Sequence, residues 1–381
     1  MRNFLKKLPM MTNKKIISRL LLTILLVVTG FAVSSCAVKN KFEFASGATK
    51  PKNVILMIGD GMGMSQVSGA MTISGNSLKM TTTRHIGFAT TQSYDNYVTD
   101  SAASGTAISS GEKTRNGMIG KGPDSTDVKH ITEELREKMN MAYGVVSTSA
   151  VTHATPASFV AHNISRNDYE GIALDYVRKQ PEVFIGGGKD NFVKRRDQRD
   201  LVKVLQDDGY EVVYTMDDLQ KVQSDKVAGL LAEGHMSRYS DGRDYALAEA
   251  TNVAIEVLMR NPNGFFLMVE GSQIDWGGHA NDPQYVLEET FDFDLAVGVA
   301  LQFASLNKNT LVIVTADHET GGMALPGGNL EDNSVQASFA TQGHTGVVVP
   351  VFAFGPGAEN FTGFFDNTDY SRKIKEVLRV R

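Results

Sequence analysis

The sequence contains a single cysteine, Cys36, among its 381 residues. The chain beyond this cysteine can form no internal disulfide, so its stability must come from packing and from any bound metal. After residue 52 there is also no apolar run long enough to span a bilayer, and no Pro-rich or Ser-rich linker interrupts the pattern. We therefore expect one folded domain beyond residue 52, without a second membrane segment.

Acidic residues are missing from the first 35 positions, which carry six basic residues and an apolar run at Leu20–Val28. This is the pattern of an export signal. Cys36 directly follows Val33-Ser34-Ser35, which resembles a bacterial lipobox, although an incidental cysteine beside an ordinary cleavage site is the alternative. A lipidated Cys36 would anchor the protein in the bacterial cell envelope, on the periplasmic or the surface side. The expected organisation is a signal peptide at 1–35, a polar tether at 36–52 and a catalytic domain at 53–381.

The sequence also lacks a basic excess. Its net charge of −5 falls to −11 once the first 35 residues are removed, because 32 Lys and Arg then remain against 43 Asp and Glu. An acidic surface repels a phosphate backbone, so nucleic acid is excluded as a partner.

Short apolar runs alternate with amphipathic stretches from residue 53 onward, which predicts a largely parallel central sheet with helices on both faces. The predicted strands are Asn53–Ile58, Tyr143–Ser147, Val183–Ile185, Tyr210–Tyr214, Phe265–Val269, Leu311–Thr315 and Val347–Phe354, with a further strand or hairpin arm at His85–Tyr94. The predicted helices are Ile131–Lys138, Asp197–Asp207, Asp244–Arg260, Val286–Ser305 and Ser371–Val380. The least patterned stretch, Leu325–Thr341, is expected to be an exposed excursion near the site.

Carboxylates and imidazoles stand next to the apolar runs at four places. They occur in VILMIGDGMG, GFFLMVEGSQIDWGGHAND, LVIVTADHETGG and GHTGVVVPVF, and they are Asp60, Glu270, Asp275, His279, Asp317, His318 and His344. Ligands of open α/β sheets bind outside the carboxyl ends of the strands, so we expect these side chains to meet at one edge. Each alone is more often a cap or a turn former. Together they indicate metal binding, since imidazole with carboxylate suits Zn²⁺ and carboxylate with hydroxyl suits Mg²⁺.

A candidate nucleophile lies in NYVTDSAASGTAISSG. Asp100-Ser101 stands at the start of a small-residue segment that is expected to begin a helix. An anion at Ser101 would then meet free N–H groups and the positive end of the helix. The alternative is that Ser101 is a simple N-cap or turn residue. Two adjacent divalent ions stabilise the attacking and leaving oxygens of a displacement at phosphorus, which favours phosphoryl transfer.

Six segments, IGDGMG, VTDSAASGTA, ATPASFVAHNISR, VEGSQIDWGGHAND, VTADHETGG and GHTG, resemble the alkaline phosphatase family in this order, over nearly all of the chain after the signal. The resemblance implies a three-layer α/β sandwich with two Zn²⁺ and one Mg²⁺. It also implies that phosphate monoesters are hydrolysed through a phosphoserine. The short segment between His318 and His344 implies a reduced crown-like excursion, which leaves a homodimer of the family type open.

The resemblance also implies a role for each matched residue. Ser101 would be the nucleophile, with Asp100 beside it, and Arg166 would clamp the phosphate through two oxygens. One zinc would be held by Asp275, His279 and His344. The other would be held by Asp60, Asp317 and His318. Asp60 would also contact the Mg²⁺, together with Thr155 and Glu270.

Two positions depart from one well-known bacterial form of the family pattern. His153 stands where that form has an aspartate near magnesium, and Trp276 stands where it has a lysine near phosphate. A histidine gives less negative charge to support Mg²⁺, and the tryptophan removes a positive charge. We therefore expect a weaker third metal site and altered phosphate release.

Other functions remain as alternatives. A phosphodiesterase or sulfatase shares the two-metal core, but the CxPSR-like motif of sulfatases is absent, and Arg166 favours a terminal phosphate. A non-catalytic phosphate- or metal-binding lipoprotein would need the metals without Ser101. The remaining histidines have no partner pattern and are expected to be structural or solvated; they are His85, His130, His162 and His235.

Overall fold

The computed structural model describes residues 50–329 and 331–380. The chain divides into residues 1–41 and 42–381, and every described residue belongs to the second unit. The predicted signal peptide, Cys36 and most of the tether lie outside the described residues. Among the helices that are described, none combines the length and the apolar character that a bilayer crossing requires.

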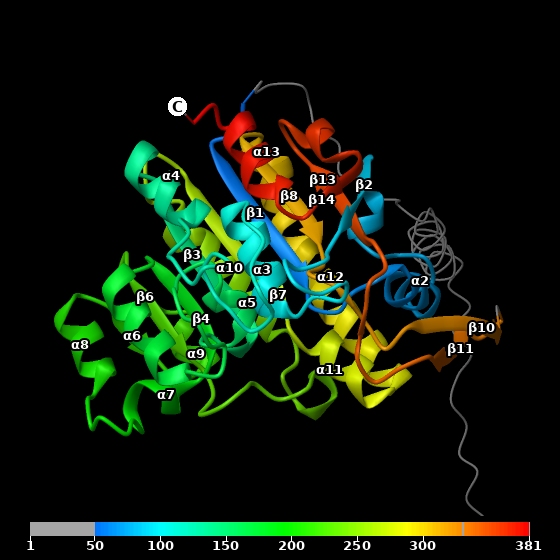
Figure 1. Ribbon diagram of the computed structural model, residues 1–381, viewed down its shortest axis with the longest axis horizontal. Helices are drawn as coiled ribbons and strands as arrows, with labels where there is room; N and C mark the ends of the chain where they lie inside the picture. Colours follow the sequence, from blue (N-terminus) through cyan, green and yellow to red (C-terminus); the bar gives the residue numbers. More distant parts are fainter. Residues whose placement is uncertain (1–49, 330, 381) are drawn as a thin grey trace, which may run out of the picture. The chain divides into compact units, whose positions relative to one another are not determined.

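A ten-stranded sheet forms the centre of the described fold (Figure 1). Its strands are β1 (Asn53–Gly59), β2 (His85–Thr90), β3 (Ala142–Ala150), β4 (Val183–Gly187), β5 (Glu211–Val213), β6 (Val227–Leu230), β7 (Phe265–Gly271), β8 (Thr310–Thr315), β13 (Val349–Phe354) and β14 (Gly363–Asp366). They lie in the order β14-β2-β13-β8-β1-β7-β3-β4-β6-β5. β13 runs antiparallel to both of its neighbours, β8 and β2, and the other pairs are parallel.

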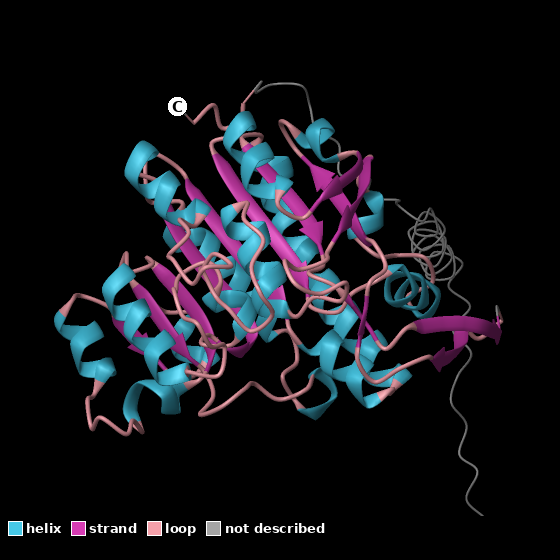
Figure 2. Cartoon of the chain, viewed as in Figure 1, coloured by secondary structure: helices cyan, strands magenta, loops and turns pink. Residues whose placement is uncertain are grey.

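Helices cover both faces of this sheet (Figures 1 and 2). They are α2 (Met64–Ile73), α3 (Ser101–Ser110), α4 (Ile131–Met139), α5 (Ala154–Ala157), α6 (Tyr169–Lys179), α7 (Lys189–Val193), α8 (Leu201–Asp207), α9 (Met216–Leu219), α10 (Ala246–Leu258), α11 (Gln273–Ala280), α12 (Pro283–Asn307) and α13 (Asp369–Val377), with short 3-10 turns η1 (Met80–Thr82), η2 (Tyr239–Asp241) and η3 (Ala358–Phe361). α10 and α12 pack together behind the central strands, and α3, α4 and α5 lie in front. Because parallel neighbours in this sheet need crossover connections, the helices between the strands come to lie on its two faces. This arrangement confirms the predicted three-layer α/β sandwich.

The central strands read as continuous apolar runs because both of their faces are covered. Every residue of β1, β7 and β8 is buried. α12 shows how the sequence defines a covering helix: Asp282 caps it by accepting from the N–H of Tyr285, and Pro283 occupies its first turn. Large apolar side chains of α12, such as Phe293, are fully buried, and each contributes roughly 1.5–3 kcal/mol by leaving water.

The structure shows that Leu325–Thr341 is largely exposed, as expected, and adds that most of its backbone is paired. Most of this stretch belongs to an antiparallel hairpin of β10 (Met323–Asn329) and β11 (Ser334–Phe339), which packs beside α2 (Figure 1) and has a register shift between Ala324 and Gly327. Every second residue of β11 is partly buried, the two-residue period of a half-covered strand. The short strands β6 and β14 were also not predicted, because four residues carry too little pattern to stand out.

Candidate active site

Three neighbouring parallel strands lead to acidic residues at one edge of the sheet. β1 is followed by Asp60, β7 contains Glu270 near its end, and β8 is followed closely by Asp317. Ile58 of β1 lies opposite both Glu270 and Thr315 in the parallel register, so the three strands reach this edge together. The predicted convergence at the carboxyl ends of the strands is present.

Ser101 is the first residue of α3. The side chain of Asp100 caps this helix by accepting a hydrogen bond from the N–H of Ala103 at 2.9 Å. The hydroxyl of Ser104 donates to the backbone carbonyl of Asp317 at 2.7 Å, which ties the first turn of α3 to the end of β8. Ser101 is thereby fixed where helix N–H groups and the helix dipole favour an anion.

The imidazole of His318 faces the serine and two carboxylates. Its Nε2 lies 3.2 Å from Ser101 Oγ, 3.2 Å from Asp317 Oδ2 and 3.4 Å from Asp60 Oδ1. All four side chains are buried. Burial and the nearby His344 lower the pKa of His318 well below its usual value, so the ring is neutral and can act as a ligand.

A second group lies beside the first. His279 Nε2 is 3.3 Å from Asp275 Oδ1, and His344 Nε2 is 3.5 Å from the same oxygen and 3.2 Å from His279 Nε2. The Nδ1 atoms donate to backbone carbonyls, that of His279 to Gln342 and that of His344 to Thr99. Such hydrogen bonds orient metal-binding histidines and leave Nε2 free to bind. His344 precedes the antiparallel β13, which brings it to the same edge.

The carboxylates of this edge are not satisfied by the protein. Asp60 Oδ1, Asp317 Oδ2 and Glu270 Oε1 are buried without a hydrogen-bond partner among the described residues. Burial, reinforced by neighbouring carboxylates, raises the pKa of Asp60 well above its usual value and that of Asp317 to about 8. Burial also raises the pKa of Glu270 to about 7. A cation would relieve this cost, and carboxylate and imidazole donors without thiolate fit Zn²⁺ or Mg²⁺.

A third group of donors adjoins Asp60. The hydroxyl of Thr155 donates to Asp60 Oδ2 at 3.4 Å, and Asp60, His153 and Glu270 offer ligand atoms within 4.8 Å of one another. His153 Nδ1 is buried and has no hydrogen-bond partner among the described residues. Burial and the neighbouring Arg166 lower the pKa of His153 to about 3, so it is a neutral donor. The group therefore offers a nitrogen as well as oxygens.

Arg166 stands beside the nucleophile. Its Nη1 donates to Asp100 Oδ2 at 2.9 Å, and its Nη2 lies 3.4 Å from His153 Nε2. The same Asp100 oxygen accepts from the N–H of Gly117 at 3.0 Å. Asp100 thus caps α3 with one oxygen and orients the guanidinium with the other. The arginine is held next to the helix N-terminus at which Ser101 lies.

Sequence reasoning missed the position of His235. Its Nδ1 accepts from the N–H of Ala150 at 3.0 Å, and its ring packs edge-on against Trp276 at 4.8 Å and against His153 at 5.5 Å between centroids. It is structural, as predicted, but it supports two residues of the site. The residue lies in a loop without any periodic pattern, so no local signal indicated this placement.

Sequence reasoning also left Glu319 without a role. This buried residue follows His318 directly and accepts hydrogen bonds from Gln66 and Thr345. Its place inside LVIVTADHETGG was the only available signal, and the identity of its partners required the fold.

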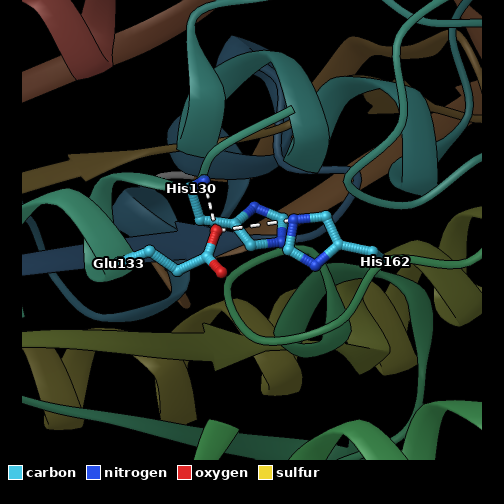
Figure 3. Close-up of side chains that lie close together, drawn as sticks. All are labelled: His130, Glu133 and His162. Carbon is cyan, nitrogen blue, oxygen red and sulfur yellow. Dashed lines mark hydrogen bonds and ion pairs between the residues drawn. The ribbon is translucent and has the colours of Figure 1, made fainter. Parts of the chain in front are cut away.

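A further group of histidine and carboxylate side chains lies away from this edge (Figure 3). Glu133 lies 3.4 Å from His162 Nε2, and it accepts from the backbone N–H of His130 at 3.0 Å and from Lys179 Nζ at 2.6 Å. His130 Nε2 donates to the carbonyl of Ala161 at 2.9 Å, and its Nδ1 lies 3.2 Å from the hydroxyl of Ser109. We call the three residues of Figure 3 the closed cluster, because hydrogen bonds within the protein already engage the carboxylate and both nitrogens of His130.

The predicted site residues thus come together at one edge of the sheet. Those brought together are Asp60, Asp100, Ser101, His153, Thr155, Arg166, Glu270, Asp275, Trp276, His279, Asp317, His318 and His344. Only Cys36, which lies outside the described residues, is not placed.

Comparison with known proteins agrees with this geometry. The sequence model of the family described as alkaline phosphatase matches residues 51–334. Alkaline phosphatase 3 of Bacillus subtilis is 34% identical, over 86% of this chain and 89% of its own length. The alkaline phosphatase of the Antarctic bacterium TAB5 is 42% identical and superimposes with a TM-score of 0.83, covering 87% of this chain and 99% of its own.

A structure of a TAB5 variant, in which a histidine is replaced by aspartate and Mg is bound in the M3 site, is also similar, with 41% identity, a TM-score of 0.82 and coverage of 87% and 99%. The family match covers far more than half of the sequence, and the relatives are matched over most of their length. The chain therefore belongs to the alkaline phosphatase family and is a metal-dependent hydrolase of phosphate monoesters.

Proposed function

We propose that this enzyme hydrolyses phosphate monoesters through a phosphoserine formed on Ser101. The observation that carries the proposal is the position of the Ser101 hydroxyl, at the N-terminus of α3 and 3.2 Å from His318 Nε2. It lies beside buried carboxylate oxygens that have no hydrogen-bond partner among residues 50–329 and 331–380. A serine that served only as a helix cap would not need an imidazole and unpartnered carboxylate oxygens beside its hydroxyl. The cap of α3 is supplied by Asp100 instead.

The donor groups fit two Zn²⁺ and one Mg²⁺. Asp275, His279 and His344, whose donor atoms lie close together, would hold one zinc. Asp60 and Asp317, which both lie beside His318 Nε2, would hold the other together with His318. Asp60, Thr155 and Glu270 would hold Mg²⁺. When bound, the metals supply positive charge that acidifies the attacking hydroxyl and stabilises the leaving oxygen. Without a cation, Asp275 raises the pKa of His279 to about 9, so metal binding displaces a proton from this group.

The protein's own groups position the phosphate. The helix end at Ser101 offers backbone N–H groups to the phosphoryl oxygens, and Arg166, oriented by Asp100, pairs with two of them. Ser101 Oγ then loses its proton and attacks phosphorus, the bond from phosphorus to the alcohol oxygen breaks, and the departing alcohol oxygen takes up a proton. In a second displacement water attacks phosphorus, the bond to Ser101 Oγ breaks, and the serine regains a proton as inorganic phosphate leaves.

We propose Mg²⁺ for the third group and expect it to bind weakly. The unpartnered nitrogen of His153 offers a neutral donor where an aspartate would add a charge. The related TAB5 enzyme variant that holds Mg in its M3 site carries an aspartate in place of a histidine. His153→Asp should therefore raise Mg²⁺ occupancy in this enzyme, measured by metal analysis after dialysis at a fixed Mg²⁺ concentration. Unchanged occupancy would contradict the assignment.

The decisive experiment compares the purified wild type with Ser101→Ala. We expect equal zinc content, with monoesterase activity in the wild type only and a phosphorylated Ser101 in mass spectra of the wild type quenched at acidic pH. Activity that survives in Ser101→Ala would exclude the serine mechanism. A zinc-loaded wild type without activity would favour the non-catalytic phosphate-binding alternative, and faster cleavage of a diester or a sulfate ester would favour the related hydrolases.

We also propose that Cys36 carries a lipid that anchors the enzyme in the bacterial cell envelope. The support is the basic and apolar pattern of residues 1–35 and the position of Cys36 directly after Ser35. Mass spectrometry of the mature N-terminus tests this proposal, and an unmodified start at another residue would refute it. Sedimentation of the soluble domain would test for a homodimer, which remains open.

A further inference from the structure

Glu319 lies at the junction of the segments that carry the proposed metal ligands. It belongs to the short strand β9 (Glu319–Thr320), directly after His318, and only 4% of it is exposed. β9 pairs with β12 (His344–Thr345), in which Thr345 lies opposite Glu319. One short antiparallel ladder therefore joins the segments of two candidate histidine ligands.

Four donors surround the carboxylate of Glu319. Oε1 accepts from Gln66 Nε2 at 2.8 Å and from the N–H of Met323 at 3.0 Å. Oε2 accepts from the N–H of Gly322 at 3.1 Å and from the hydroxyl of Thr345. Both oxygens are fully engaged, so the side chain has one orientation and cannot turn towards a metal without breaking these bonds.

These donors link three segments of the site, which carry Asp60, His318 and His344. Gln66 lies in the first turn of α2, which follows the loop of Asp60, and its amide also donates to the carbonyl of Thr320 at 3.0 Å. Gly63 passes so close that a β-carbon at this position would lie 2.4 Å from Glu319 Cγ. The carboxylate therefore sets the position of the Asp60 loop as well as that of the two histidine segments.

Thr320 extends the connection to the fourth part. Its hydroxyl donates to Asp275 Oδ1, and its N–H donates to the carbonyl of Gly61 at 3.2 Å. Gly61 has a φ of +74°, and a β-carbon there would lie 2.8 Å from Asp275 Cα, so only glycine fits between the two segments. Glu319 and Thr320 together reach every strand end that supplies a proposed zinc ligand.

The charge of Glu319 is not neutralised by a basic side chain. Its four donors are two backbone N–H groups, an amide and a hydroxyl, and within the described residues no Lys or Arg forms an ion pair with it. A buried negative charge beside His318 adds to the attraction for a cation in a region of low dielectric constant.

We propose that Glu319 is a positioning residue that holds His318 and His344 in the geometry that binds zinc. The two imidazoles are stacked, with 3.6 Å between centroids and 17° between planes, an arrangement that the β9–β12 ladder and the Glu319–Thr345 hydrogen bond maintain. This inference rests on the proposed function, because it takes both histidines to be zinc ligands. It assigns a role to a carboxylate that contacts neither the substrate nor a metal.

Glu319→Gln tests the inference because it keeps the shape and removes the charge. One carboxylate oxygen is replaced by an NH₂ group, which cannot accept a hydrogen bond. Some of the four hydrogen bonds that Glu319 accepts must therefore be lost. We expect zinc to dissociate about 10- to 100-fold faster into a chelator than from the wild type, since partners that orient metal ligands typically carry this much affinity. We also expect an altered visible spectrum of the Co²⁺-substituted protein. Activity should return towards the wild-type kcat at saturating zinc.

Asp294→Asn is the matched control. Asp294 is also buried and accepts from backbone N–H groups, those of Lys79 at 2.6 Å and Met80 at 2.9 Å, but it joins α12 to η1. The Asp294→Asn variant should have a lower thermal stability than the wild type, while its rate of zinc dissociation and its Co²⁺ spectrum should stay unchanged. Thr345→Val is the milder variant should Glu319→Gln fail to fold, and it should give a smaller acceleration of zinc loss.

The outcomes separate this inference from the proposed function. If Glu319→Gln, or the Thr345→Val substitute, loses stability as Asp294→Asn does while zinc dissociation and the Co²⁺ spectrum stay as in the wild type, Glu319 is only structural and the inference is wrong. If the wild type binds zinc but shows no monoesterase activity, the proposed function fails. Faster zinc loss from Glu319→Gln would then still support its positioning role.

Discussion

The edge of the sheet that carries Asp60, Ser101, Asp317, His318 and the residues around them, which we call the active edge, contains the same kinds of residue as the closed cluster. Both groups are largely buried. At the active edge, one carboxylate oxygen each of Asp60 and Asp317 has no hydrogen-bond partner in the described part of the chain, whereas Glu133 in the closed cluster is paired with Lys179 and a backbone N–H. The protein therefore neutralises one group itself and leaves the other to a cation. Proximity of histidine and carboxylate residues is therefore not enough to indicate a metal site; what distinguishes this edge is that proximity is combined with buried donor atoms that have no partner among the described residues.

The acid–base properties of the two regions differ accordingly. At the active edge burial raises the pKa of Asp317 to about 8. In the closed cluster burial would also raise the pKa of Glu133, but hydrogen bonds from His162 and Lys179 overcome it and hold that pKa well below its usual range. Burial lowers the pKa of His130 to about 3, so this ring stays neutral. The closed cluster is complete without an ion, and the active edge is not.

Removal of the metals should have the largest effect on activity and on the free energy of unfolding, and this effect should come from the active edge and not from the closed cluster. Dialysis against a chelator should abolish monoesterase activity and lower the free energy of unfolding by about 4 kcal/mol for each site at which the free metal had been near a thousand times its Kd. The loss should be restored by Zn²⁺ and Mg²⁺. Calorimetry with and without the chelator, in the wild type and in His162→Ala, measures it. The metal content of His162→Ala should equal that of the wild type, and a lower content would show that the closed cluster binds metal too.

Single histidine replacements sharpen the comparison. His318→Ala should weaken one zinc and slow formation of the phosphoserine by about a hundredfold or more, because the group lost is a direct ligand rather than its partner. His344→Ala should act through the other zinc, with an effect that depends on the leaving group. Single-turnover kinetics with a good and a poor leaving group separates the two. Equal effects of both variants on both substrates would contradict the division of ligands.

Acidification should affect the closed cluster through His130. Its pKa is about 3 in the folded chain against 6.5 when exposed, so between these values the unfolded chain binds a proton that the folded chain does not. The free energy of unfolding therefore has its full His130 contribution above pH 6.5. This contribution falls as the pH is lowered, by about 2 kcal/mol at pH 5. Denaturant titrations of the wild type and His130→Gln at constant zinc would measure this. Parallel pH profiles of the two proteins would show that His130 does not contribute.

Removal of the lysine that pairs with Glu133 in the closed cluster should have the smallest effect on stability. Lys179→Met removes the cation that pairs with Glu133, and because this lysine side chain is about a third exposed, we expect a loss of only about 1 kcal/mol. Activity and metal content should not change. If Zn²⁺ then stabilised the variant more than the wild type, the lysine would be the feature that keeps this cluster from being a metal site.

The parts of the molecule that the sequence predicts are those that depend on local pattern. The strand before Asp60, the strand before Asp317 and the start of α3 at Ser101 each combine an apolar run or a cap with a ligand-type residue, and all lie where expected. The stretch Leu325–Thr341 is largely exposed, as expected, but its pairing into a hairpin was not predicted, because a half-exposed strand has a weak apolar signal.

What the sequence did not predict depends on partners that are distant along the chain. Glu319 receives its hydrogen bond from Gln66 across 253 residues, and His235 meets Trp276 only because a loop folds back over α11. Neither residue has a motif of its own. Hydrogen bonds between neutral donors and a carboxylate leave no spacing rule in a sequence, so only the fold identifies them.

The direction of β13 has a consequence for the order in which the molecule can become active. The strand runs against its neighbours, and His344, which precedes it, completes a zinc group whose other members were synthesised long before. A chain still emerging from the ribosome has the serine and the strand ends but cannot close the site. Pairing over such sequence distances is a slow step in folding. Retention of this zinc would therefore report that the chain has been made and folded at least as far as His344, and a chain truncated before Gly343 should be inactive and unable to hold the zinc of Asp275 and His279.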